Sequence, residues 1–160
     1  EMCIRDSDAA IAEVPLPNGQ RSDAFARAER AAWEETGEAY RPALLADVPL
    51  IPAHTALLTT TVYHGSNPPG IVDIVPSESP RPAGWTAALV IVDGLIGQAV
   101  DDGICQRFSH VPGMPELLLR AVSYRRYVND LHSESRSNTR SHIERVEQHL
   151  VSRASAILER

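Results

Sequence analysis

Three aspartates near the middle of the sequence have a side-chain type and spacing that could bind a metal ion. Asp93 lies in an apolar run, and Asp101 and Asp102 follow that run directly before Gly103. Mg²⁺ prefers oxygen ligands, and a bound metal lowers the pKa of an attacking water and neutralises the charge that develops. We therefore take Asp93, Asp101 and Asp102 as candidate catalytic and metal-binding residues.

Two carboxylates upstream could complete this site. Asp73 and Glu78 precede the apolar run, and either would have to fold back toward the later aspartates to share a hydrated ion with them. Each acid also has a purely structural explanation. Asp93 could be a polar residue in the last turns of a helix, the Asp-Asp pair could form a turn, and Asp73 could face solvent from a strand.

Arginines are concentrated in the last third of the chain. All 15 basic residues are Arg; residues 114–160 hold 8 of them against 6 acids, a net charge of +2, whereas residues 1–113 hold 7 against 15, a net charge of −8. Arginines on a helical arm could contact DNA phosphates, or they could form a solvated face paired with acids at i,i+4 spacing. The candidate DNA-contacting residues are Arg21, Arg120, Arg125, Arg126 and Arg140.

The elements that must position these residues are of mixed type. Stretches rich in Thr, Val, Ile and Tyr indicate strands, and apolar residues at i, i+3, i+4 and i+7 indicate helices. We predict strands over residues 11–16, 55–64, 71–75 and 104–111, and helices over residues 22–35, 85–96, 116–131 and 141–159.

The last predicted helix has two further features. Ser141 and Glu144 have the spacing of a capping box, which would start the helix there. An apolar stripe follows along one face of the helix, and it would form a dimer surface if it did not fold onto the core. The stripe consists of Ile143, Val146, Leu150, Ala154 and Ile157.

The predicted fold is α/β (α+β), with a small mixed sheet, packed helices and a C-terminal helical pair. We expect an α/β domain over residues 8–113 and a helical extension over residues 114–160.

Residues 1–7, EMCIRDS, match the translation of a sequencing adapter, so we expect them to be library sequence. A gene disturbed by that fusion would have no intact function. Because no run approaches about 20 apolar residues, we expect no membrane span and a cytoplasmic protein.

The order of these elements resembles that of RusA-type Holliday-junction resolvases. The matching stretches are LPNGQR before a helix with AERAAWEE, then AHTALLTTTVY, then TAALVIVDGL followed by VDDG. The resemblance covers about residues 13–113. It implies a homodimer that cuts branched DNA in recombination and repair with Mg²⁺, and it places the family's acids on Asp93, Asp101 and Asp102.

The sequence also departs from the pattern of that family. Leu89 stands where the family has a helix lysine, and SPRPAGW stands where it has an acid-rich stretch. A cooperating catalytic set that loses one member commonly loses orders of magnitude in rate. We therefore predict a Mg²⁺-dependent junction endonuclease or a weakened descendant. The alternative is a non-enzymatic DNA-binding or protein-interaction module that uses the arginine-bearing helices.

Overall fold

The structure is a computed structural model of the 160-residue chain, and it describes residues 27, 30–31, 33–34, 45–130 and 138–158. Its helices and strands confirm an α+β fold. The elements are β1 (Leu50–Ile51), β2 (Thr61–Val62), β3 (Gly70–Ile71), β4 (Arg81–Pro82), α3 (Trp85–Ile96), α4 (Ile104–Arg107), α5 (Met114–Asp130) and α6 (Arg140–Leu158).

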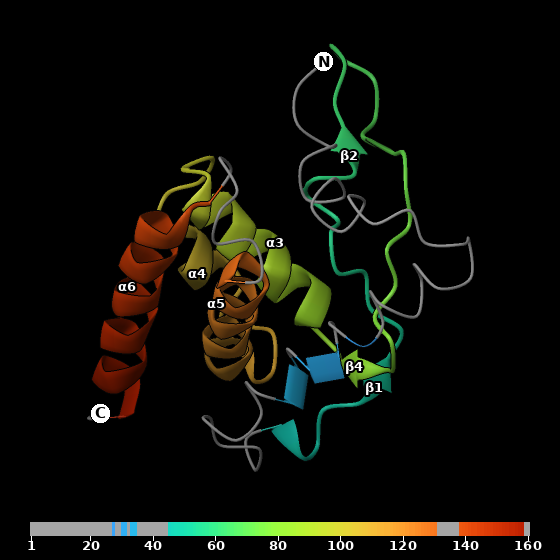
Figure 1. Cartoon of the computed structure of the whole chain (residues 1–160). Coiled ribbons are helices and arrows are strands. Elements are labelled where there is room, and N and C mark those ends of the chain that lie inside the picture. The colour runs from blue at the N-terminus through green and yellow to red at the C-terminus, as the bar shows by residue number, and fades with distance from the viewer. Residues whose placement is uncertain (1–26, 28–29, 32, 35–44, 131–137, 159–160) are drawn as a thin grey trace.

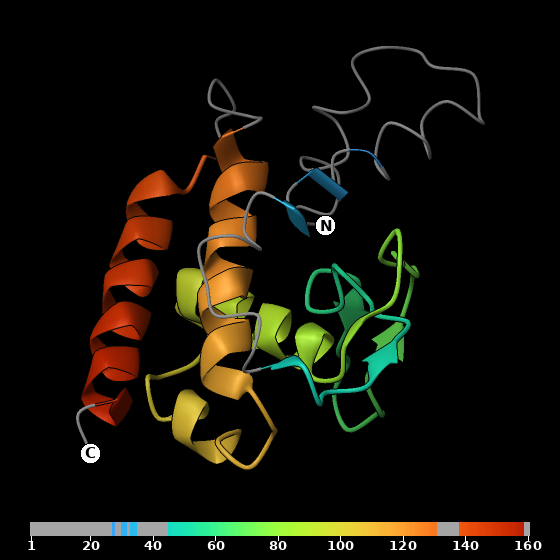
Figure 2. The same ribbon diagram turned by 90° about the horizontal axis from the view of Figure 1, so that it is seen from below.

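Helices α3, α5 and α6 form the body of the molecule. Figures 1 and 2 show α5 and α6 side by side and antiparallel, with α3 crossing behind them. One hydrophobic cluster runs through all three helices and includes Leu45 and Ala53 from the preceding segment. The core therefore crosses the expected boundary between residues 113 and 114. None of the described helices is long and apolar enough to span a membrane.

Helix α3 has the bounds that its apolar spacing predicts. Trp85, Ala88, Leu89, Val92 and Leu95 are all buried, as one face of a 3.6-residue period requires. The helix begins after a glycine with a φ of 98°, a conformation that residues with a Cβ rarely adopt. A Cβ at this glycine would also lie 2.9 Å from a side-chain carbon of Val111, so only glycine fits the start of the helix.

Helices α5 and α6 confirm the predicted C-terminal helical pair. Ile143, Val146 and Leu150 are buried in the core and Ala154 packs against it, so the described part of the stripe folds onto the body instead of forming a separate dimer surface. The prediction that Ser141 and Glu144 form a capping box was wrong, because α6 begins at Arg140. The side chain of Asn138 accepts a hydrogen bond from the Arg140 amide at 3.2 Å and caps the helix earlier.

Residues 53–77 form an antiparallel ribbon, which we call the arm. β2 pairs with β3, and further bonds join Thr55 N to Val75 O at 2.8 Å and Ser77 N to Ala53 O at 2.9 Å. The arm projects away from the helices, with β2 and β3 near its far end (Figure 1). The second pair, β1 with β4, is also antiparallel, so the described sheet consists of two separate ribbons.

Two strand predictions were wrong in part. The strand over residues 55–64 shortens to β2, because hydroxyl groups of Thr60 and Thr61 bond to the carbonyls of Ala56 and Leu57 and favour a turn. The returning strand over residues 71–75 shortens to β3, although its backbone still bonds to the opposite side of the arm.

The strand predicted over residues 104–111 was wrong. This segment is α4 followed by turns, in which Ser109 N bonds to Gln106 O and Val111 N to Phe108 O. An isolated strand this short has no partner to satisfy its backbone, whereas a helical turn satisfies its own. The strand over residues 11–16 lies outside the described residues, and residues 27, 30, 31, 33 and 34 of the predicted first helix are helical.

Candidate functional site

Asp93 is held by a partly buried arginine. Arg125 on α5 donates from Nε to Asp93 Oδ1 at 2.6 Å and from Nη2 to Oδ2 at 2.7 Å. The two side chains are 19% and 14% exposed. Burial lowers the pKa of Arg125, but the charge and hydrogen bonds of Asp93 outweigh this and raise that pKa overall. A bidentate pair of this kind is strong and directional, and it occupies both carboxylate oxygens of Asp93.

The same arginine fixes the base of the arm. Arg125 Nη2 also donates to the carbonyl oxygen of Thr55 at 2.7 Å. Beside it, the hydroxyl of Thr86 on α3 accepts a hydrogen bond from the amide of His54 at 2.8 Å. Helices α3 and α5 therefore anchor the base of the arm, and Asp93 has a structural part in that anchor.

Asp101 and Asp102 lie in the turn before α4, and their contacts differ from those of Asp93. Asp101 Oδ1 accepts a hydrogen bond from Gly103 N at 2.8 Å, which is the turn-forming role that its position also predicts. Asp102 Oδ2 lies 3.7 Å from Nδ1 of His149 on α6. Both carboxylates are largely exposed, at 75% and 67%.

The two upstream acids each have a partner within the protein. Asp73 is exposed in the arm, where its carboxylate accepts a hydrogen bond from the neighbouring Ile74 amide at 2.8 Å. Glu78 forms an ion pair with Arg30, and the hydrogen bond from Arg30 lowers the pKa of Glu78. Across the part of the chain that the structure describes, no three His, Cys, Asp or Glu side chains are placed to hold a metal ion together. Metal binding by the five acids stays a prediction.

The described candidate DNA-contacting arginines make contacts within the protein. Arg120 is buried, with its guanidinium 3.7 Å from the centre of the Trp33 ring, and burial lowers its pKa. Arg126 bonds to Glu147 at 2.7 and 2.9 Å, which links α5 to α6. Arg140 bonds to Asp130 at 2.7 Å. The Arg126–Glu147 and Arg140–Asp130 pairs join separate helices, whereas the sequence predicted pairs at i,i+4 spacing. Arg21 lies outside the described residues.

An apolar groove, which the sequence reasoning missed, lies on the outer face of α3. Its volume is about 510 Å³. The groove is bounded by α3, α4, the base of the arm, and β1 with β4. Its described lining contains no charged residue and consists of Ile51, Ala53, Leu57, Pro82, Gly84, Trp85, Thr86, Ala87, Val90, Ile91, Val100, Ile104 and Phe108.

A sequence signal for this groove did exist. In α3, WTAALVIVDGLI, Thr86 and Asp93 are the polar residues, so the helix is apolar on nearly every face. A helix of that kind needs cover on its second face as well as its first. Ala87 and Val90 of α3 line the groove and are only partly buried, whereas Ala88, Leu89 and Val92 are buried in the core, so the second face is only partly covered by the described chain.

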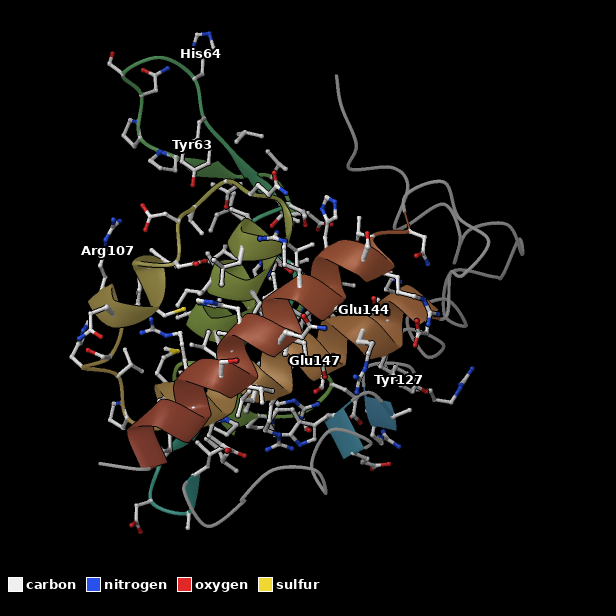
Figure 3. All side chains as sticks on the ribbon, turned by 90° about the vertical axis from the view of Figure 1, so that its left-hand side faces the viewer. Tyr63, His64, Arg107, Tyr127, Glu144 and Glu147 are labelled. Atoms are coloured by element: carbon white, nitrogen blue, oxygen red, sulfur yellow. The ribbon has the colours of Figure 1, made fainter. Side chains whose placement is uncertain are left out.

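The far end of the arm and α4 both carry side chains that extend into solvent. Tyr63 and His64 point outward at the end of the arm, and Arg107 projects from α4 (Figure 3). Leu50, Tyr63 and Ile74 are between 65% and 75% exposed.

No protein-family model matches this chain, and neither a curated protein nor a solved structure matches it. The geometry of the groove and of the arm therefore carries the argument about function.

Proposed function

We propose that this protein is a non-enzymatic protein-interaction module whose groove binds an apolar segment of a polypeptide. The observation that carries the proposal is a cavity of about 510 Å³ with no charged side chain in its described lining. Apolar surface that is left partly open gains free energy when a partner covers it, at about 25 cal/mol per Å² buried. Exposed apolar surfaces of this kind mark interaction sites.

The chemistry of the lining favours a polypeptide over a small polar ligand. Small-molecule sites usually combine an apolar wall with a few polar groups that orient the ligand. In this groove two lining side chains carry a polar group: the Thr86 hydroxyl already accepts a hydrogen bond from the His54 amide, and the indole nitrogen of Trp85 is buried. The remaining wall offers shape and apolar contact, which suits side chains of Leu, Ile, Val or Phe from another chain.

Rigid anchoring also supports binding at this groove. The Asp93–Arg125 pair and the Thr86–His54 bond hold the arm base against α3, so the walls are fixed before a partner arrives. A preformed groove binds more tightly because less ordering entropy is lost on association.

A peptide selection tests this proposal. We expect immobilised protein to enrich apolar peptides from a random displayed library, and Val90→Asp to lower their affinity at least about 30-fold, since a charge would be buried in the groove. Val151→Asp is the matched control, because Val151 is exposed on α6 and does not line the groove. Selected peptides that bind Val90→Asp as tightly as the unmodified protein would refute the proposal.

The junction endonuclease is the second candidate, and the exposed Asp101–Asp102 pair is the observation that favours it. We nevertheless expect a labelled four-way junction to remain uncut in Mg²⁺, because both carboxylate oxygens of Asp93 are bonded to Arg125 and no three described His, Cys, Asp or Glu side chains are placed to hold a metal ion together. Gel analysis of the junction with and without Mg²⁺ measures this. Cleavage that Asp102→Asn abolishes, with folding unchanged, would establish the nuclease instead.

A further inference from the structure

We infer that the groove binds the end of the arm, residues 61–72, from a second copy of the same chain, and that two copies exchange arms reciprocally. This inference rests on the proposed function, because it names the occupant of the same groove. In such a dimer each protomer supplies one arm and one groove, so the two contacts are identical and related by a two-fold axis.

The end of the arm needs a partner. Paired residues of an antiparallel ribbon point to the same face and successive residues alternate, so Tyr63 and Ile71 share one face and Val62 and Val72 share the other. All four side chains are at least 45% exposed. A two-stranded hairpin is at best marginally stable alone in water, and this one presents apolar side chains on both faces. Contact with another surface would stabilise it.

The arm and the groove match in charge. Residues 61–72, TVYHGSNPPGIV, contain no Asp, Glu, Lys or Arg, although such residues make up 22% of the chain. The described groove lining contains none either. Burying one against the other therefore desolvates no formal charge, which is the main cost that would oppose an apolar contact.

A chain cannot easily place the end of its arm in its own groove. Arg125 and Thr86 hold the arm base at Thr55 and His54, beside α3. From that fixed base the arm runs outward, and His64 at its tip points away from the helices (Figure 3). The groove lies at the base and the free apolar surface at the far end, an arrangement that suits exchange between two copies.

The exposed apolar area is close to what a stable dimer needs. Burying one aliphatic side chain contributes about 1.5–3 kcal/mol at about 25 cal/mol per Å², which corresponds to about 60–120 Å² of surface removed from water. Four apolar side chains at the end of the arm, each at least 45% exposed, would then contribute roughly 200 Å². Each protomer also has its own groove covered by its partner's arm, so an interface about 57% apolar would bury roughly 500–700 Å² per protomer, near the lower end of standard interfaces. The four are Val62, Tyr63, Ile71 and Val72.

Sedimentation velocity of the full chain over a range of concentrations tests the inference. We expect the unmodified protein to dimerise, and Tyr63→Asp on the arm or Val90→Asp in the groove to weaken dimerisation at least about 100-fold, because each removes both symmetric contacts. Val151→Asp should dimerise normally. Circular dichroism melting establishes that each variant is folded.

Mixing the two variants gives the decisive result. Tyr63→Asp retains an intact groove and Val90→Asp retains an intact arm, so an equimolar mixture restores one of the two contacts. We expect heterodimers that are weaker than the unmodified dimer and tighter than either variant alone. A dimer that neither variant weakens would overturn the inference. A monomeric unmodified protein that still enriches groove-binding peptides would overturn it and leave the proposed function standing; a monomer that enriches none would overturn both.

Discussion

Replacing Arg125 with Met is expected to lower the free energy of unfolding by about 3 kcal/mol, the lower end of the range for buried pairs, because the partly buried Asp93 carboxylate would lose its partner. The Thr55 carbonyl would lose its guanidinium donor in the same change, so the arm base would loosen as well. Urea denaturation at pH 7, followed by circular dichroism, measures the loss.

A double variant separates the charge from the packing. Arg125→Met combined with Asp93→Leu replaces the ion pair by apolar side chains, and such replacements are often neutral or stabilising. We expect the double variant to recover most of the stability that Arg125→Met loses. If the double variant were as unstable as the sum of the two single variants, Asp93 and Arg125 would not be coupled, and Asp93 would again be available as a catalytic acid.

Replacing Trp85 with Ala is expected to cost about 3–5 kcal/mol of unfolding free energy and to lower the melting temperature by roughly 10 °C or more. Trp85 is fully buried at the start of α3. Its ring contacts Trp33 and Tyr124 edge to face, with centroids 4.9 and 5.7 Å apart. Deleting it leaves a large cavity between α3, α5 and the first helix, and differential scanning calorimetry measures the consequence.

Trp85→Phe is the matched control for this prediction. Phe keeps an aromatic ring at the centre of the cluster and removes an indole N–H that has no hydrogen-bond partner within the described structure. We expect a loss of about 1–2 kcal/mol, less than half that of Trp85→Ala. Equal losses for the two variants would show that the ring contacts contribute little. Because Trp85 also lines the groove, Trp85→Ala should also lower the affinity of the protein for the selected peptides.

The helices could be predicted from sequence because the pattern that forms them is local. The apolar spacing in residues 85–96 predicted α3 with its observed bounds, and the segments after Met114 gave α5 and α6 to within two residues. The arm could be predicted only in part: the two strands that pair in it were expected, but not their short length. Threonines that favour a strand by composition instead bond to their own backbone over residues 56–61, and α4 replaces an expected strand.

The candidate site depended on contacts that no local pattern contains. The sequence by itself determined where the acids and arginines stand, and that α3 is apolar on nearly every face. Only the tertiary structure decided that Asp93 pairs with Arg125, 32 residues away, and that the second face of α3 forms a groove with α4 and the arm base. Ion pairs and grooves arise where distant segments meet, and side-chain spacing along one segment does not encode that meeting.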